Sequence, residues 1–277
     1  MVWFETHCHL QDDRFKDDLP DVVARAKAAG VSSIVLATSN VPDSRTAVEL
    51  ALEHGLYCTV GIHPHDASTF DQDSREELEQ LVRYADRQAE ELGRDKVVVA
   101  IGEIGLDYHY DFSPRDVQRR VFSEQMELAA KLGLPLVFHV REAFQDFFTL
   151  IEEAKNDQLF LQEDPGVVHC YSGSVEFAER LLPFGFLFGF DGPLTFKNAK
   201  TPVAVAKHLP LERLVIETDA PYLTPVPHRG KRNEPAFIPY IGEKMAEIRQ
   251  IATEEVARIT TENAIRLFRL NPQLLFA

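Results

Sequence analysis

The chain has 277 residues, 45% hydrophobic and 26% charged, which suits a globular protein with one large domain or two small ones. Its 29 basic and 44 acidic residues give a net charge of −15, which disfavours nonspecific binding to polyanions or anionic membranes, although metal ions and a few basic side chains would still hold a nucleic acid locally. Three cysteines without a CxxC pair suit a reducing compartment, and neither a transmembrane segment nor a signal peptide is evident, so we expect a cytoplasmic protein without membrane association.

Short apolar runs alternate with amphipathic segments along the whole chain. The runs are expected to be strands and lie at 2–4, 33–37, 56–60, 97–101, 135–139, 166–170, 186–190 and 213–219. Helices are expected between and after them, at 20–30, 42–55, 74–92, 114–132, 143–155, 175–182, 201–209 and 241–268. The pattern therefore begins with a strand, ends with a helix and repeats eight times.

Strands that are apolar on both faces are typical of buried parallel sheets. Eight strand–helix units in one chain predict a single-domain (β/α)8 TIM barrel spanning residues 1–277. A doubly wound open sheet is the alternative, but it gives no reason for eight strands.

Six of the eight runs end in a histidine or an acidic residue. In a barrel the carboxyl ends of the strands meet on one face, where such enzymes keep their chemistry. The residues at these ends are His7 and His9, His63 and His65, Glu103, His139, His169, and Asp219.

Four imidazoles and two carboxylates are enough to hold two divalent ions, with Glu103 as a bridging carboxylate. The predicted metal ligands are His7, His9, Glu103, His139, His169 and Asp219. Mixed imidazole and carboxylate ligation suits zinc or manganese, whereas magnesium prefers more oxygen. Each residue alone has an ordinary alternative, a buried histidine bonded to a carbonyl or an aspartate that caps a helix.

Two metal ions would lower the pKa of a shared water and stabilise charge that develops on substrate oxygens. Asp219 is then the candidate to take the proton from that water, and Glu103 is the second catalytic candidate. Glu217 lies two residues earlier on the same face and is either an alternative proton acceptor or a structural partner.

Seven motifs spread over nearly the whole chain resemble those of the TatD family, in the family's order. They are Thr6–Leu10, Gly61–His65, Ala100–Tyr108 (AIGEIGLDY), Phe138–Arg141, His169–Gly173, Glu217–Tyr222 (ETDAPY), and Arg229–Lys231 with Asn233–Pro235. The resemblance implies a metal-dependent hydrolase of the amidohydrolase-like barrel group, often a deoxyribonuclease that releases nucleotides from the 3′ end. By position it also implies that the six residues named above are the metal ligands.

Two residues depart from the family pattern, and one of them matters, since Tyr171 in place of a commoner phenylalanine is expected to be harmless. Glu5 stands where the family usually has an aspartate, and it would orient a ligand histidine. The longer side chain is expected to alter metal affinity more than the fold.

Several side chains near the predicted site are candidates for holding a phosphodiester substrate. They are His63, His65, Arg141, Arg229, Lys231 and Asn233. The planar guanidinium of an arginine suits a phosphate. The alternative for Arg141 is a salt bridge to a nearby carboxylate. The alternative for the basic segment 228–232 is a solvated turn. Asp107 would either orient a histidine or shape a turn.

Three functions are compatible with these residues. The first is a two-metal deoxyribonuclease of the 3′–5′ exonuclease type that acts on the ends of single-stranded DNA, because paired bases would have to unstack to enter a pocket. The second is a metal-dependent hydrolase of small esters or amides, including aminoacyl esters, and the net charge favours this one mildly. The third is a metal-binding scaffold without activity. No feature indicates an obligate protein partner.

Overall fold

The computed structural model describes residues 1–160 and 163–271, and its contacts divide the chain into two units. The first unit contains Met1–Leu36, Cys170–Arg180 and the chain from Leu187 onward. The second unit contains Ala37–His169 and Leu181–Phe186. The domain boundary of 1–277 stays a prediction, and its last residues, 272–277, lie outside the described part.

The first unit is built on four parallel strands. They are β1 (Trp3–Cys8), β2 (Val31–Leu36), β7 (Leu187–Phe190) and β8 (Leu214–Ile216). Strand β1 pairs with β2, and β7 pairs with β8. Just beyond the paired residues, the Asp219 N–H donates to the His7 carbonyl oxygen at 2.9 Å. The first and last strands of the chain are therefore joined within this unit.

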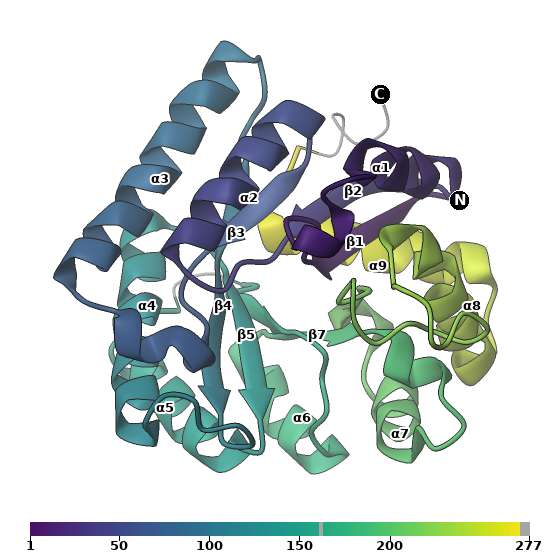
Figure 1. Cartoon of the computed structure of the whole chain (residues 1–277). Coiled ribbons are helices and arrows are strands. Elements are labelled where there is room, and N and C mark those ends of the chain that lie inside the picture. The colour runs from purple at the N-terminus through teal and green to yellow at the C-terminus, as the bar shows by residue number, and fades with distance from the viewer. Residues whose placement is uncertain (161–162, 272–277) are drawn as a thin grey trace. The chain divides into compact units, whose positions relative to one another are not determined.

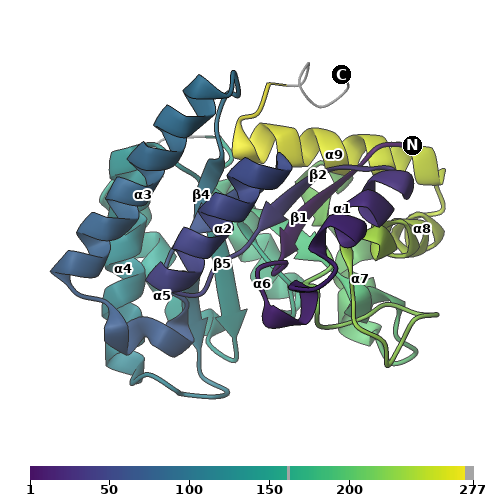
Figure 2. The same ribbon diagram turned by 45° about the horizontal axis from the view of Figure 1, so that its top comes forward.

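The helices of the first unit pack on these strands. They are α1 (Leu19–Ala28), α7 (Lys200–His208), α8 (Ile238–Arg249) and α9 (Thr253–Phe268), and α6 (Val175–Leu181) begins here. Helix α9 runs beside β1 in both views (Figures 1 and 2), where the rings of Phe4 and Phe268 stack with centroids 5.9 Å apart. The C-terminal helix thus covers the N-terminal strand.

The second unit also contains four parallel strands, paired in chain order. They are β3 (Tyr57–Val60), β4 (Val98–Asp107), β5 (Leu136–Arg141) and β6 (Gly166–Val168). Their helices are α2 (Val41–His54), α3 (Gln72–Glu91), α4 (Arg115–Leu132) and α5 (Phe144–Asn156). Helix α3 lies between α2 and α4 in Figure 1, and Phe138 of β5 packs edge-on against Phe122 and Phe147.

Local chemistry sets the ends of the helices. The Asn40 side chain accepts from the Asp43 N–H at the start of α2, and Gly55 ends that helix with a left-handed φ of 71°. Asp71 and Ser74 form a reciprocal capping box at the start of α3. These signals explain why the predicted boundaries of α2 and α3 fall within two residues of the observed ones.

Two expectations about the elements were wrong. The segment predicted as one helix from 241 to 268 is two helices, because Gln250 adopts a left-handed φ of 55° after α8. Strand β4 continues to Asp107, so Glu103 lies inside the strand and not at its end. Among the described residues, no helix is long and apolar enough to cross a membrane.

Gly242 allows α8 to approach β1 closely. A Cβ added there would lie 2.1 Å from Cη2 of Trp3, a side chain that is only 1% exposed. Alanine inside a helix normally gains about 0.5–1 kcal/mol over glycine. Overpacking a core costs about 1–3 kcal/mol, so here the clash outweighs the gain in helix propensity.

We expect Gly242→Ala to lower the free energy of unfolding by about 1–2 kcal/mol, measured by urea denaturation. Trp3→Phe removes the ring atoms that the new methyl group would meet, so the cost of Gly242→Ala should shrink in that background. An equal cost in both backgrounds would show that this contact is not the cause.

Candidate metal centre

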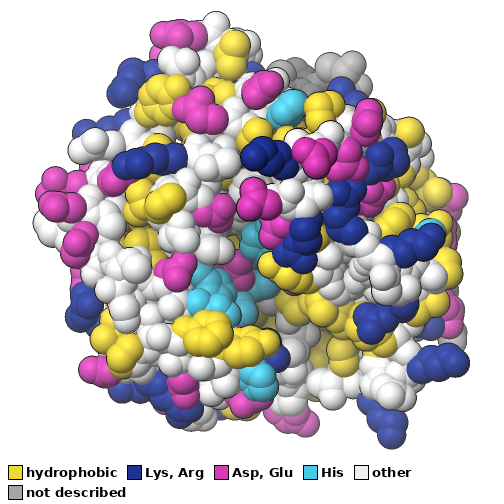
Figure 3. Space-filling model, in the orientation of Figure 1, with side chains coloured by type: hydrophobic (Ala, Val, Ile, Leu, Met, Phe, Trp, Pro, Cys, Tyr) yellow, Lys and Arg dark blue, Asp and Glu magenta, His cyan; other side chains and the backbone are white. Residues whose placement is uncertain are grey.

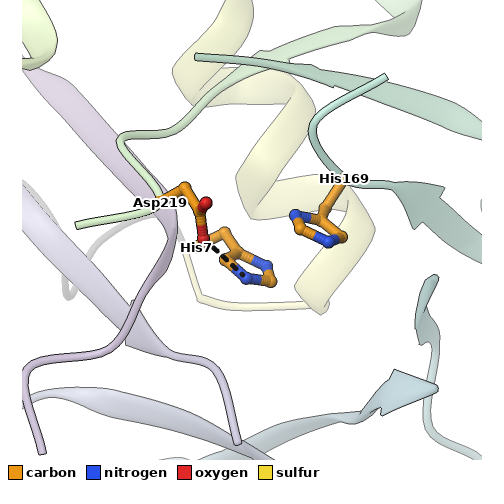
Figure 4. A group of neighbouring side chains, drawn as sticks. All are labelled: His7, His169 and Asp219. Atoms are coloured by element: carbon orange, nitrogen blue, oxygen red, sulfur yellow. Dashed lines mark ion pairs between the residues drawn. The ribbon is translucent and has the colours of Figure 1, made fainter. Parts of the chain in front are cut away.

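Asp219 in the first unit lies beside two histidines. His7 is buried in β1, His9 follows the end of β1, and Asp219 follows β8. Oδ1 of Asp219 lies 3.7 Å from Nε2 of His7 and 3.3 Å from Nε2 of His9. Figure 4 shows His7 and Asp219 with their ion pair as a dashed line. The structure thus brings together three of the predicted ligands, the first-unit cluster of His7, His9 and Asp219.

Backbone hydrogen bonds fix this cluster. The Asp219 N–H donates to the His7 carbonyl, and the His9 N–H donates to the Ala220 carbonyl at 2.7 Å. Asp219 itself has a positive φ of 55°, a conformation that aspartate tolerates better than most residues. The turn after β8 therefore directs this carboxylate toward the end of β1.

Glu5 supports the same turn from β1. Its carboxylate is fully buried and accepts hydrogen bonds from the backbone N–H groups of His7 at 3.0 Å and Thr218 at 2.9 Å. The Thr218 hydroxyl donates to the other oxygen at 2.5 Å. Burial raises the pKa of Glu5 to about 8, although these hydrogen bonds act in the opposite direction. In these contacts Glu5 orients the backbone of β1 at His7 and of the turn after β8 at Thr218.

Glu217 has the contacts of a structural partner, one of its two predicted roles. It is fully buried, accepts from the Cys170 N–H and lies 3.2 Å from the Thr6 hydroxyl. A Cβ added at Gly189 would lie 2.4 Å from a Glu217 oxygen, so only a glycine in β7 leaves room for this carboxylate.

Asp191 is a site candidate that sequence reasoning missed. It directly follows β7, is 4% exposed, and its pKa is raised to about 8 by burial and then by the charge of Asp219. The signal was present, because Asp191 follows the apolar run 186–190 in the way that the other candidates follow theirs.

Glu103 in the second unit is surrounded by histidines. Its Oε1 lies 2.6 Å from Nε2 of His169 and 3.1 Å from Nδ1 of His139. Nε2 of His63 is 3.6 Å from the same oxygen. Three predicted ligands and one predicted substrate-binding histidine therefore form the second-unit cluster of His63, Glu103, His139 and His169.

Asp107, at the end of β4, orients two histidines of the second unit. Its Oδ2 lies 3.0 Å from Nε2 of His139 and 3.0 Å from Nε2 of His65. Its Oδ1 accepts from the N–H groups of His109 and Tyr110. Asp107 thus fills both predicted roles, since it orients histidines and shapes a turn.

The two central histidines of this unit have opposite electrostatic surroundings. Burial and then the neighbouring His139 hold the pKa of His63 well below its usual value, which favours the neutral imidazole that binds metals. Burial also disfavours charge on His139, but hydrogen bonds to Asp107 and Glu103 prevail and raise its pKa to about 9. The Nδ1 atom of His139 faces Glu103, while Nε2 is held by Asp107.

The predicted substrate-binding residues have different surroundings. The guanidinium carbon of Arg141 lies 4.8 Å from the ring centroid of Tyr110, and that of Arg229 lies 3.8 Å from the ring of Phe196. Lys231 is exposed, as a substrate contact requires. Asn233 is fully buried, and its amide donates to the carbonyls of Thr218 and Tyr222, so it supports the loop, and a contact with substrate stays a prediction.

The donor atoms fit a divalent metal. One ligand atom each from His63, Glu103 and His139 lies within 4.8 Å of the other two. Imidazole nitrogens around a carboxylate oxygen form the donor set that zinc and manganese favour. The first-unit cluster offers the same atom types, two imidazoles and one carboxylate.

A family model described as TatD related DNase matches residues 4–269. The chain belongs to the TatD family. It is 43% identical over 97% of its length to the uncharacterized metal-dependent hydrolase YabD of Bacillus subtilis, 99% of which is covered. It is 36% identical over 95% of its length to the 3′-5′ ssDNA/RNA exonuclease TatD of Edwardsiella piscicida, 97% of which is covered.

The crystal structure of YjjV, a TatD homologue of Escherichia coli, is similar over nearly the whole chain. The TM-score is 0.85 at 30% identity, and the match covers 97% of this chain and 98% of that one. Together with parallel strands paired in chain order, this agreement confirms the predicted (β/α)8 barrel. As a member of this TatD family, the protein is a metal-dependent hydrolase.

We expect Glu5→Ala to destabilise the metal-free protein by about 2–4 kcal/mol, because it leaves buried N–H groups of His7 and Thr218 without their acceptor. Glu5→Gln keeps an acceptor oxygen of the same reach and should cost less than half as much. Urea denaturation of both variants in chelator checks this, and equal losses would contradict the assigned role.

Proposed function

We propose that this protein is a 3′–5′ exonuclease that hydrolyses phosphodiester bonds at the ends of single-stranded DNA with the help of two divalent ions. The observation that carries the proposal is the position of the Glu103 carboxylate. Glu103 lies within β4 of the second unit, and three imidazoles approach its carboxylate. Relatives with the same overall length are named exonucleases that act on single-stranded DNA or RNA.

The proposed metal ligands are the six residues predicted from the sequence. The first-unit cluster supplies His7, His9 and Asp219, and the second unit supplies Glu103, His139 and His169. Both groups lie toward the carboxyl ends of strands, where barrel enzymes keep their chemistry. Zinc, manganese or magnesium would lower the pKa of a water molecule and neutralise charge on the phosphodiester oxygens.

The side chains of this protein have separate roles in that reaction. Asp219 would accept the proton of the attacking water, because its Oδ1 is already placed beside His7 and His9 by the turn after β8. Glu103 would hold metal through its carboxylate, together with the imidazoles of His139 and His169. Asp107 would hold His139 through Nε2, so that Nδ1 stays directed at Glu103.

Several side chains would bind the strand. Arg141 would approach a phosphate with its planar fork. His63 and His65, whose ring centroids lie 4.3 Å apart in the same unit, would also contact the strand. Arg229, Lys231 and Asn233 would act from the loop after β8, with Asn233 keeping that loop in place. On a chain with a net charge of −15, such local contacts are needed to hold a polyanion.

We expect Glu103→Ala to lose bound metal and to lower metal-dependent release of nucleotides by more than about 100-fold. Elemental analysis of purified protein would report two ions per chain in the wild type and fewer in the variant. Glu179 of α6 lies on the surface, where its carboxylate is 2.8 Å from the imidazole of His208 of α7. Glu179→Ala is therefore the matched control and should retain both metal and activity. Unchanged metal content in Glu103→Ala would reject the site.

The direction and chemistry of the reaction can be tested with labelled strands. We expect a 3′ label on single-stranded DNA to be released before a 5′ label, and chelator to abolish release. A blocked 3′ end should protect the strand. If the metal-loaded protein leaves every strand intact but cleaves an ester reporter, the proposal fails, and hydrolysis of small esters or aminoacyl esters takes its place.

A further inference from the structure

Two aromatic rings stand exposed in the loop that follows β4. Phe112 is 68% exposed and Tyr110 is 49% exposed, although each offers a large apolar face. Their ring planes are 17° apart and their centroids 5.2 Å apart, so the two rings are stacked on one another. Of the exposed large hydrophobic side chains in the described part of the chain, these are the two whose rings stack together.

The loop holds these rings in place from both ends. Before them, the Asp107 carboxylate accepts from the Tyr110 N–H at 2.9 Å. After them, the Ser113 hydroxyl donates to the His65 carbonyl at 2.9 Å and accepts from the Ser68 N–H at 3.0 Å. An exposed ring on an anchored loop presents a fixed flat surface, which lowers the entropy lost when a ligand binds.

The rings also adjoin the histidines of the candidate site. The centroid of Phe112 lies 4.8 Å from that of His65, and His65 lies 6.1 Å from His139. Arg141, a proposed phosphate contact, lies with its guanidinium carbon 4.8 Å from the centroid of Tyr110. Figure 3 shows hydrophobic side chains directly beside histidines on the face toward the viewer. The second unit thus brings an aromatic face next to a guanidinium and to the imidazoles of the candidate site.

We propose that Tyr110 and Phe112 form a stacking platform for an unpaired nucleobase of the DNA strand, next to the phosphodiester that is cut. The inference rests on the proposed nuclease function. Every base has a flat π-face, so a base laid on Phe112 would extend the existing stack regardless of its identity. A paired base is already stacked within the duplex, and the platform would therefore favour single strands.

One of the carboxylates beside the platform has its charge offset by an arginine. Asp111 is paired with Arg115 at 2.7 Å, and Glu142 hydrogen-bonds to the His109 ring at 2.8 Å. Arg141 supplies a cation on the same side of the loop as Tyr110. The platform is therefore suited to a base whose flanking phosphate approaches Arg141.

A fluorescent variant tests the stacking directly. Trp3 is the only tryptophan in the chain and is 1% exposed, so the Phe112→Trp variant adds one accessible emitter. We expect a phosphorothioate single strand, which resists cutting, to quench this emission in the full-length metal-loaded protein. An abasic strand with the same backbone should leave it unchanged, and equal quenching by both strands would overturn the platform.

Binding of the same strand to substituted proteins gives a second readout. Phe112→Ala and Phe112→Leu should each weaken Kd by about tenfold, whereas Phe112→Trp should retain it. Leu92→Ala removes a similarly exposed apolar side chain at the end of α3 and should have no effect. Wild-type affinity in Phe112→Leu would overturn the proposal, because a general apolar contact would then suffice.

The two proposals fail separately. If wild-type protein cuts DNA but Phe112→Trp shows no base-dependent quenching, the platform is wrong and the nuclease function stands. If base-dependent quenching occurs but wild-type protein releases no nucleotides, the platform is supported and the nuclease function is wrong.

Discussion

Two backbone hydrogen bonds between the ends of β1 and β8 hold the first-unit cluster together. They join His7 to Asp219 and His9 to Ala220, residues that are more than two hundred positions apart in the chain. Glu5 and Thr218 also join β1 to the turn after β8, because the Glu5 carboxylate accepts hydrogen bonds from the N–H and the hydroxyl of Thr218. Because these hydrogen bonds hold His7, His9 and Asp219 in place, a shift of β1 against β8 would separate the two imidazoles from the carboxylate.

In the second unit, the candidate residues are positioned by the close approach of β4 and β5. Gly105 of β4 pairs with His139 of β5, and a Cβ at Gly105 would lie 2.0 Å from the His139 carbonyl oxygen. Gly105 also has a φ of 140°, which side chains rarely adopt. The glycine therefore lets β4 continue past Glu103 and end at Asp107. One strand thus supplies both the proposed metal-binding carboxylate and the carboxylate that orients a histidine.

The strand pattern and the side chains at strand ends could be predicted because both depend on local sequence. Features that depend on distant contacts were not predictable. Glu103 lies within a strand because β4 continues to pair with β5 after its apolar run has ended. Asn233 is buried because its amide donates to the carbonyls of Thr218 and Tyr222. Asp191 is a different case, since its position after a strand was visible in the sequence. The break at Gln250 lacks the glycine or proline that usually marks the end of a helix.

Neither unit is a continuous stretch of chain, and this has a consequence for synthesis on the ribosome. Met1–Leu36 belongs to the same unit as the segments that carry β7, β8 and α9. Strand β1 can pair with β2 early, but its other edge and the ring of Phe4 stay uncovered until the last third of the chain emerges. Contacts between such distant segments are slow to form, so the N-terminal strand depends most on protection from aggregation while the chain is incomplete.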